Sequence, residues 1–176
     1  MIAIVDYQMG NLRSVQKAFE HKGFEARITD EPSAILGADG VVLPGVGAFG
    51  DCYRELEARK LIGPLREWIA EDRPFLGICL GLQVLLDSSQ ESEGVSGLKV
   101  IGGSVKRFSA NGIKVPHMGW NQVRYPAAGE RSGECPIFEG IADGTYFYFV
   151  HSYYIAPDDA TSVSGWTTYG VPFASA

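Results

Sequence analysis

Cys79 is the residue of this sequence whose type and surroundings best suit covalent chemistry. It stands in Gly77-Ile78-Cys79-Leu80-Gly81, between an apolar run at 74–78 and a helix-like pattern at 80–86. A cysteine at a strand-to-helix corner, with glycine two residues away on each side, is typical of a nucleophile elbow. The glycines let strand and helix pack closely, and the start of the helix favours a thiolate. We therefore predict a catalytic thiol, the alternative being a buried cysteine that packs as a small hydrophobic side chain.

A glycine-containing bend follows the preceding apolar strand. Pro44-Gly45-Val46-Gly47 comes directly after the run at 40–43. Glycines at the carboxyl end of a strand allow unusual backbone angles, so that N–H groups can point into a site. Such groups would suit an oxyanion hole beside Cys79, completed by the N–H of Leu80. On the residues alone a plain turn is the simpler interpretation.

Two polar residues after the cysteine are candidates for binding a substrate. Gln83 lies four residues beyond Cys79, one helical turn away, where its amide could bind a polar group. Glu91 stands in an acidic stretch at 88–93 and could pair with a substrate ammonium. The alternative for Glu91 is a solvated acidic loop.

A thiol nucleophile needs a nearby imidazole, and the sequence has three histidines. His21 ends a predicted helix and is most simply a residue that interacts with the helix dipole. His117 and His151 could each be the base on spacing alone, although we favour a structural role for both. Trp120, in a Gly-Trp-Asn segment, is either part of the core or an interface anchor.

The elements that must position these residues alternate in the first half of the chain. Strands are expected at 2–5, 25–29, 40–43 and 74–78, and helices at 11–22, 31–36, about 51–59 and 64–70. This alternation predicts an α/β fold with a parallel sheet, helices on both faces and the active site at the carboxyl ends of the strands. The second half is β-rich at 99–108, 114–118, 146–150 and 162–167. We interpret it as antiparallel additions within a single domain, 1–176.

Composition excludes several classes of function. The formal net charge is −6 and no basic cluster occurs, so neither nucleic acid nor an anionic membrane is the expected ligand. The three cysteines, Cys52, Cys79 and Cys135, are odd in number and widely spaced, which argues against a disulfide framework or a zinc site and suits a reducing cytosol. We expect no signal peptide, no membrane span, and a cytoplasmic location.

Four strings together resemble the class I (triad) glutamine amidotransferases. Within them the chain is similar to the glutaminase subunits of imidazole glycerol phosphate synthases. The strings run over 6–15, 43–49, 115–121 and 149–154, and one departure is Gln8, where the family usually has glycine. The resemblance implies a flavodoxin-like, mixed but mostly parallel sheet with added antiparallel strands, and activity without a cofactor or a metal.

The resemblance also implies a role for each matched position. Cys79 attacks the side-chain amide of glutamine to form a γ-glutamyl thioester. Its oxyanion is held by the N–H of Leu80 and, after a peptide flip at Gly45-Val46, by the N–H of Val46. The amino-acid end of glutamine is bound by a further group of residues: Gly47, Gln83, Glu91, Ser152 and Tyr153.

The remaining matched positions concern a partner, with which the chain would form a heterodimer. The partner is a (β/α)₈-barrel cyclase, which uses the ammonia to make imidazole glycerol phosphate and aminoimidazole carboxamide ribotide in histidine biosynthesis. Three matched residues face the cyclase and the ammonia passage, and two support that region: Asn11, Met118 and Trp120, then His117 and Asn121.

One departure bears on catalysis. The family completes its triad with a His and a Glu in a Phe-His-Pro-Glu-like string, which is absent from these 176 residues. We expect a truncated copy that lacks its C-terminal segment and turns glutamine over poorly, the alternative being a naturally shortened relative. Two other functions stay open: another class I amidotransferase subunit, such as one of anthranilate synthesis, and an inactive subunit that only docks a partner.

Overall fold

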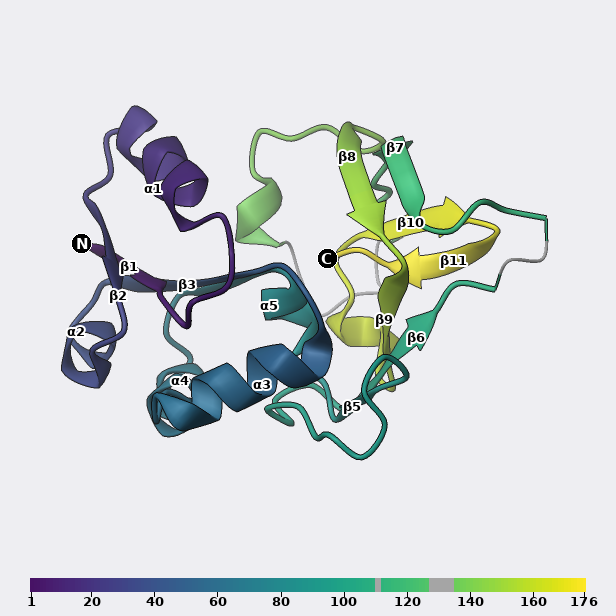
Figure 1. The fold of residues 1–176 in the computed structure, drawn as a ribbon. Coiled ribbons are helices and arrows are strands. Elements are labelled where there is room, and N and C mark those ends of the chain that lie inside the picture. Colours follow the sequence, from purple (N-terminus) through teal and green to yellow (C-terminus); the bar gives the residue numbers. More distant parts are fainter. Residues whose placement is uncertain (110–111, 127–134) are drawn as a thin grey trace. The chain divides into compact units, whose positions relative to one another are not determined.

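The computed structural model of the protein describes residues 1–109, 112–126 and 135–176. The chain forms two compact units, Met1–Val100 and Ile101–Ala176, whose elements are labelled in Figure 1. Each unit has its own sheet structure. The described part of the chain contains no helix that is both long enough and apolar enough to cross a membrane.

The first unit is built on a parallel sheet. Its strands follow the order β2-β1-β3-β4, and each neighbouring pair is parallel. This order matches the first four strands of a flavodoxin-like sheet, as expected. The strands and the short β5 are β1 Ile2–Val5, β2 Ala26–Thr29, β3 Gly40–Gly45, β4 Phe75–Cys79 and β5 Ser88–Ser89. The helices are α1 Leu12–His21, α2 Pro32–Leu36, α3 Phe49–Ala58, α4 Ile62–Ala70 and α5 Leu80–Gln83.

Helices cover both faces of this sheet, as predicted. Ile4 and Val42 form a buried cluster that packs against Leu12, Val15 and Phe19 of α1. Side chains alternate along a strand, so the neighbouring buried residues of β1 and β3 point to the opposite face. Figure 1 shows α3 and α4 on that side of the sheet, away from α1.

The third strand is longer than the sequence predicts. We expected it to end at 43, but β3 continues through Gly45, with Pro44 opposite Ile78 and Gly45 opposite Cys79 in the parallel register with β4. The glycine-containing bend therefore starts inside the sheet. This register places the bend directly beside the predicted nucleophile.

The helix after Cys79 is shorter than predicted. The pattern at 80–86 forms only one helical turn, α5, because the segment that follows takes the next carbonyl groups. Leu98 N–H donates to the carbonyl of Val84 at 2.7 Å, and Val100 N–H donates to that of Leu85 at 2.8 Å. The same bonds explain why the strand expected from 99 begins only at 103.

The second unit is antiparallel, as predicted. Its strands follow the order β10-β11-β9-β6, and β7 and β8 form a separate antiparallel pair. The sequence analysis did not predict β9. The bounds are β6 Gly103–Arg107, β7 His117–Gln122, β8 Tyr146–His151, β9 Tyr153–Pro157, β10 Trp166–Tyr169 and β11 Val171–Ala174, with short 3₁₀ turns at η1 Pro136–Phe138 and η2 Ala160–Ser162.

Candidate active site

Cys79 has the backbone conformation of a nucleophile elbow. It lies between β4 and α5 with φ 55° and ψ −110°, a region that residues with a Cβ rarely occupy. Such a conformation costs about 1–3 kcal/mol and persists only when the surrounding structure imposes it. The Cys79 side chain is exposed, whereas that of Cys52 is fully buried. The description of a small buried hydrophobic residue therefore fits Cys52 and not Cys79.

The two flanking glycines are required by close packing. A Cβ on Gly81 would lie 1.7 Å from the carbonyl oxygen of Leu43 in β3, and a Cβ on Gly77 would lie 2.8 Å from the carbonyl oxygen of Gly81. Neither position has room for a side chain. The Gly-x-Cys-x-Gly pattern thus reports the close approach of α5 to β3 and β4, which forces the turn at Cys79.

The structure brings the glycine-containing bend and the cysteine together. Gly45 is the register partner of Cys79, Val46 is exposed, and Gly47 has a φ of +99°. The backbone N–H of Leu80, at the first position of α5, lies near the sulfur of Cys79 and lowers its pKa. The bend and the backbone N–H of Leu80 thus both lie beside the thiol.

The thiol is not pre-ionised by its surroundings, contrary to our expectation. Desolvation by the surrounding protein raises the pKa of Cys79, the N–H of Leu80 lowers it, and the charge of Glu91 raises it. Desolvation is the largest of these three effects, so the Leu80 N–H does not offset it. Cys79 is therefore a thiol at neutral pH and needs a base to remove its proton.

Glu91 is an anchored residue and not part of a solvated loop. Its Oε2 accepts a hydrogen bond from Phe49 N–H at 2.8 Å, and the Ser92 hydroxyl accepts one from Gly50 N–H at 2.9 Å. These N–H groups open α3, whose N-cap residue Ala48 offers no side-chain acceptor. Glu91 and Ser92 therefore cap the N-terminus of α3. The capping bond holds the Glu91 carboxylate in place, with its charge near enough to raise the pKa of Cys79. Gln83 ends α5, one turn beyond Cys79.

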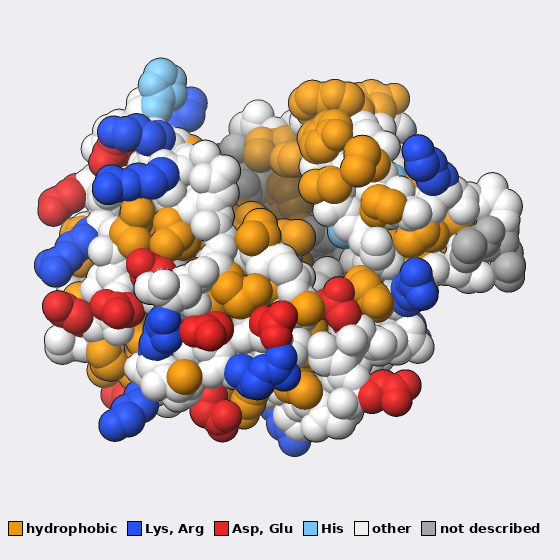
Figure 2. All heavy atoms as spheres, in the orientation of Figure 1, with side chains coloured by type: hydrophobic (Ala, Val, Ile, Leu, Met, Phe, Trp, Pro, Cys, Tyr) orange, Lys and Arg blue, Asp and Glu red, His pale blue; other side chains and the backbone are white. Residues whose placement is uncertain are grey.

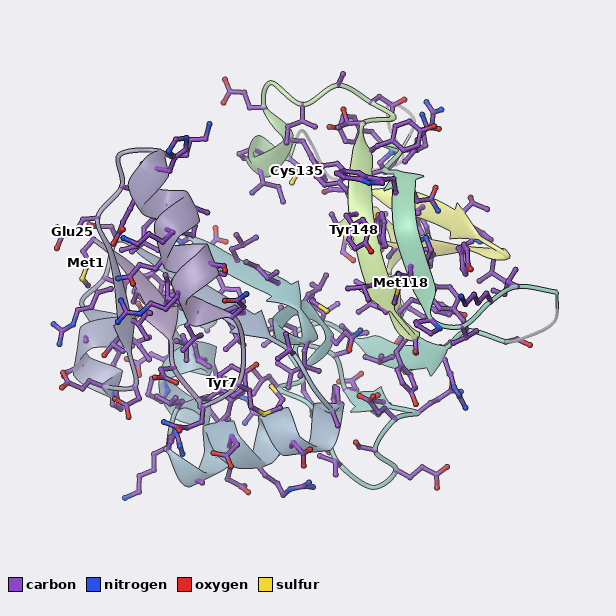
Figure 3. The ribbon with its side chains drawn as sticks, turned by 45° about the horizontal axis from the view of Figure 1, so that its top comes forward. Met1, Tyr7, Glu25, Met118, Cys135 and Tyr148 are labelled. Carbon is purple, nitrogen blue, oxygen red and sulfur yellow. The ribbon has the colours of Figure 1, made fainter. Side chains whose placement is uncertain are left out.

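A buried residue to which the sequence analysis assigned no role makes a hydrogen bond to the bend. Tyr7, labelled in Figure 3, is fully buried, and its hydroxyl donates to the carbonyl oxygen of Pro44 at 2.8 Å. The thiol of Cys52 lies near the same hydroxyl. Tyr7 lies in the matched string 6–15, but the resemblance gave it no role, and an aromatic residue just after a strand is too common to single out.

Both candidate base histidines lie in the second unit, where they bind each other. His117 Nδ1 and His151 Nε2 are 2.9 Å apart, and His151 Nδ1 lies 2.7 Å from the carbonyl oxygen of Tyr153. Since His151 Nδ1 must donate to that carbonyl, His151 Nε2 accepts and His117 Nδ1 donates. His117 Nε2 is then left to accept from Asn121 Nδ2 at 3.3 Å.

This chain of bonds holds both rings neutral. Burial is the main cause that lowers the pKa of His117 to about 4, with the neighbouring His151 as the second cause. Burial also lowers the pKa of His151, although its bond to Tyr153 opposes the change. His117 is stacked on Tyr169, with ring centroids 4.0 Å apart. The structural role that we favoured for these histidines matches this geometry.

The other predicted residues have defined places. Asn11 caps α1, because its Oδ1 accepts from Ser14 N–H at 3.4 Å. The carbonyl of Ser152, between β8 and β9, accepts from Phe108 N–H at 3.0 Å. Asn121 Nδ2 also donates to the carbonyl of Thr168 at 2.9 Å.

An apolar face covers the outer side of the β7–β8 pair. Met118 pairs with Val150 and Trp120 with Tyr148 in the antiparallel register, and Trp120 and Tyr148 make an edge-to-face contact at 5.7 Å. Trp120 is 70% exposed. Figure 2 shows hydrophobic side chains gathered over these strands, and Figure 3 labels one residue on each strand. We call the following exposed residues the aromatic face: Met118, Trp120, Tyr146, Tyr148 and Val150.

Among residues 1–109, 112–126 and 135–176, no cluster of three His, Cys, Asp or Glu side chains could hold a metal ion. The three cysteines are free thiols, with Cys135 partly exposed beside η1.

Comparison with known proteins agrees with this geometry. A family model of class I glutamine amidotransferases matches residues 3–174. The chain is 53% identical over 173 residues to imidazole glycerol phosphate synthase subunit HisH of Moorella thermoacetica, covering 98% of this chain and 79% of that protein. It is 50% identical to the HisH subunit of Geobacter sulfurreducens, covering 99% of this chain and 84% of that protein.

Solved structures share the fold at lower sequence identity. A crystal structure described as a glutamine amidotransferase superposes with a TM-score of 0.66 at 15% identity, covering 88% of this chain and 74% of that one. PurLQS from Thermotoga maritima gives a TM-score of 0.63 at 17% identity, covering 97% of this chain and 75% of that one.

Proposed function

Because the chain belongs to the class I glutamine amidotransferase family, and within it to the HisH subunits of imidazole glycerol phosphate synthase, we propose that it releases ammonia from glutamine for a cyclase partner. The observation that carries this proposal is the exposed Cys79 at φ 55°, next to Gly45 and the N–H of Leu80. The site of action is the cytoplasm, and the reaction belongs to histidine biosynthesis.

The proposed chemistry begins with the thiolate of Cys79. It attacks the side-chain carbonyl carbon of glutamine, and a C–S bond forms. The C–N bond of the amide then breaks, and ammonia leaves with the proton that the thiol gave up. Water hydrolyses the thioester to glutamate and restores the thiol. Because the pKa of Cys79 is raised, the first step needs a general base.

The developing oxyanion would be stabilised by two backbone donors. The first donor is the Leu80 N–H, which already lies near the Cys79 sulfur. The second is the Val46 N–H, which becomes available when the Gly45–Val46 peptide rotates. Glycines on both sides of Val46, one of them at φ +99°, support that rotation. Each such donor typically contributes about 10²–10³ in rate.

The amino-acid end of glutamine would be held by polar groups around the thiol. The anchored carboxylate of Glu91 suits the substrate ammonium, and the Gln83 amide and the backbone at Gly47 suit its other polar atoms. For the backbone of Ser152 and Tyr153, a role in substrate binding rests on the resemblance alone. Ammonium binding to Glu91 would also remove part of the charge that raises the Cys79 pKa.

The aromatic face is the proposed docking surface for the (β/α)₈-barrel cyclase. Exposed aromatic residues are enriched among residues that dominate binding energy, and five exposed apolar side chains lie together on β7 and β8. His117 and Asn121 keep the backbone beside the aromatic face in place by the bonds described above, whereas Asn11, which caps α1, is a proposed interface residue by the resemblance alone. Ammonia passing into the partner would stay neutral and nucleophilic.

We further propose that these 176 residues by themselves turn glutamine over slowly. Their three histidines are His21, at the end of α1, and the mutually bonded pair His117 and His151. None is poised as the triad base, so acylation should proceed at the rate set by the small thiolate fraction.

Affinity labelling tests the proposal without requiring turnover. A chloroketone analogue of glutamine should alkylate Cys79 faster than chloroacetone does, because the amino-acid end adds binding energy. Peptide mapping by mass spectrometry should locate the label on Cys79, and excess glutamine should slow it.

Two variants serve as controls. Cys79→Ala should abolish rapid labelling, and Cys135→Ala should leave it unchanged, since Cys135 lies beside η1 in the second unit. Equal rates for the chloroketone and chloroacetone, or a label placed mainly on Cys135, would refute the proposed function.

A further inference from the structure

Tyr7 makes a buried contact directly under the proposed oxyanion bend. It follows β1, is fully buried, and donates its hydroxyl proton to the carbonyl oxygen of Pro44 at 2.8 Å. Pro44 and Gly45 form the last register pairs of β3, opposite Ile78 and Cys79. The hydroxyl therefore acts on the peptide that enters the bend, one residue before the peptide that must rotate.

The segment around Tyr7 is packed tightly against the bend. A Cβ on Gly45 would lie 2.4 Å from the Tyr7 hydroxyl oxygen, and a Cβ on Gly47 would lie 2.6 Å from Cε of Met9. A Cβ on Gly10 would lie 3.6 Å from the Pro44 carbonyl oxygen. Gly45 has no room for a Cβ beside the Tyr7 hydroxyl, so this hydroxyl is a built-in contact of the bend.

Burial keeps the Tyr7 hydroxyl protonated, so it can donate a hydrogen bond. The thiol of Cys52, on α3 and fully buried, lies near this hydroxyl. Burial raises the pKa of Cys52 to about 11 and that of Tyr7 well above its usual range, so both groups keep their protons. The O–H of Tyr7 is therefore a donor, and its acceptor is the carbonyl oxygen of Pro44.

We propose that Tyr7 is a positioning residue for the oxyanion site, because its hydroxyl fixes the Pro44–Gly45 peptide and confines rotation to the Gly45–Val46 peptide. This inference rests on the proposed function and deepens it. With the carbonyl of Pro44 held, rotation about ψ of Gly45 and φ of Val46 turns the Val46 N–H toward the substrate without moving the rest of β3. Without that bond, the rotation spreads over two peptides and the N–H is less often in place.

Tyr7→Phe removes the hydroxyl and keeps the ring. We expect labelling by the chloroketone analogue of glutamine, whose carbonyl oxygen occupies the oxyanion site, to slow by roughly fivefold to tenfold. Alkylation by iodoacetamide, which reports access and ionisation of the thiol, should change by less than about twofold. The ratio of the two rates separates oxyanion positioning from a general loss of structure.

Cys52→Ala is the matched control. It removes the thiol near the same hydroxyl and leaves the bond to Pro44, so the ratio of rates should stay near that of the unmodified chain. Equal slowing by both reagents in Tyr7→Phe, or no slowing by either, would overturn the inference. If the unmodified chain does not prefer the chloroketone over chloroacetone, the proposed function fails instead, and the two failures are distinct.

A measurement on the unmodified chain keeps the inference testable if Tyr7→Phe does not fold. Backbone ¹⁵N relaxation dispersion should show exchange at the Val46 amide, which reports the Gly45–Val46 peptide. The Gly45 amide, which reports the Pro44–Gly45 peptide, should show little exchange. Exchange of equal amplitude at both amides would contradict the proposal that the Tyr7 hydroxyl fixes the Pro44–Gly45 peptide.

Discussion

At the scale of single residues, Cys79 carries two separate costs: an unusual backbone conformation and a raised thiol pKa. Close packing at Gly77 and Gly81 imposes the first, and desolvation is the main cause of the second. A structural cysteine would have no reason to accumulate both. They fit a nucleophile that is presented to substrate and activated only when a base is in place.

The backbone strain predicts an unusual order of stabilities. Glycine readily adopts φ 55°, ψ −110°, so Cys79→Gly should be more stable than Cys79→Ala by about 1–2 kcal/mol. The same pair of substitutions at the exposed Glu57, inside α3, should give the opposite order by about 1 kcal/mol. Urea unfolding measures both differences. An alanine variant at position 79 as stable as the glycine variant would show that the turn is unstrained.

The raised pKa predicts the pH profile of alkylation. Because its pKa is raised, Cys79 stays a thiol at pH values where an ordinary cysteine begins to ionise. The rate of alkylation by iodoacetamide should therefore rise about tenfold per pH unit up to and beyond pH 9. The rate is followed at the peptide that contains Cys79, with the Cys79→Ala variant giving the background. A plateau already reached below pH 8 would mean that the site stabilises the thiolate.

At the scale of elements, the active-site geometry depends on how closely α5 approaches β3. Gly81→Ala would place a methyl group 1.7 Å from the Leu43 carbonyl oxygen, so the helix must move and the elbow must open. We expect a loss of about 3 kcal/mol or more, together with loss of selective labelling at Cys79. Gly63→Ala in α4, where a Cβ meets nothing within 4 Å, is the control and should stabilise by up to about 1 kcal/mol. Equal effects of both variants would contradict the packing argument.

The paired histidines of β7 and β8 predict acid sensitivity. In the folded state the pKa of His117 is depressed to about 4, so the unfolded chain binds a proton below about pH 6.5 that the folded chain does not. Stability should therefore fall as pH is lowered from about 6.5 toward 4. Urea midpoints at several pH values measure the slope. His117→Asn should reduce this dependence of stability on pH, whereas His21→Asn, at an exposed position, should leave it unchanged. The same slope in the unmodified chain and in both variants would show that His117 is not its cause.

Sequence patterns predicted the elements of the first unit better than the contacts among them. The run at 2–5, the glycine–cysteine–glycine spacing and the alternation up to 78 reflect local packing rules, and the sheet follows them. The end of β3 and the shortness of α5 depend on pairing with residues far along the chain, such as Cys79 and Leu98. The bonds of Tyr7 to Pro44 and of His117 to His151 join residues 37 and 34 positions apart, which spacing alone does not reveal.

At the scale of the whole molecule, the two units divide the proposed task. The first holds the thiol, the oxyanion bend and Glu91, and the second holds the aromatic face and the backbone of Ser152 and Tyr153. Transfer of ammonia would need both, because the nitrogen released at Cys79 must reach a partner bound elsewhere on the chain. Loss of the aromatic face should then uncouple partner binding from the chemistry of the thiol.

Trp120→Ala tests that division. Trp120 is 70% exposed and in contact with Tyr148, so its truncation should weaken binding of the cyclase partner by about tenfold to thirtyfold, as measured by calorimetry. Selective labelling of Cys79 should be unchanged. Phe24 of the first unit, 58% exposed, supplies the control, since Phe24→Ala should leave partner binding intact. Unaltered affinity in Trp120→Ala would place the docking surface elsewhere.

The most direct test of the central claim is to trap the acyl group itself. The chain, mixed with its cyclase partner and glutamine and then quenched in acid, should carry a γ-glutamyl adduct on the peptide that contains Cys79. Hydroxylamine should remove this adduct, as expected of a thioester, and Cys79→Ala should not form it. Release of glutamate by Cys79→Ala at the rate of the unmodified chain, or an adduct on another residue, would contradict the account.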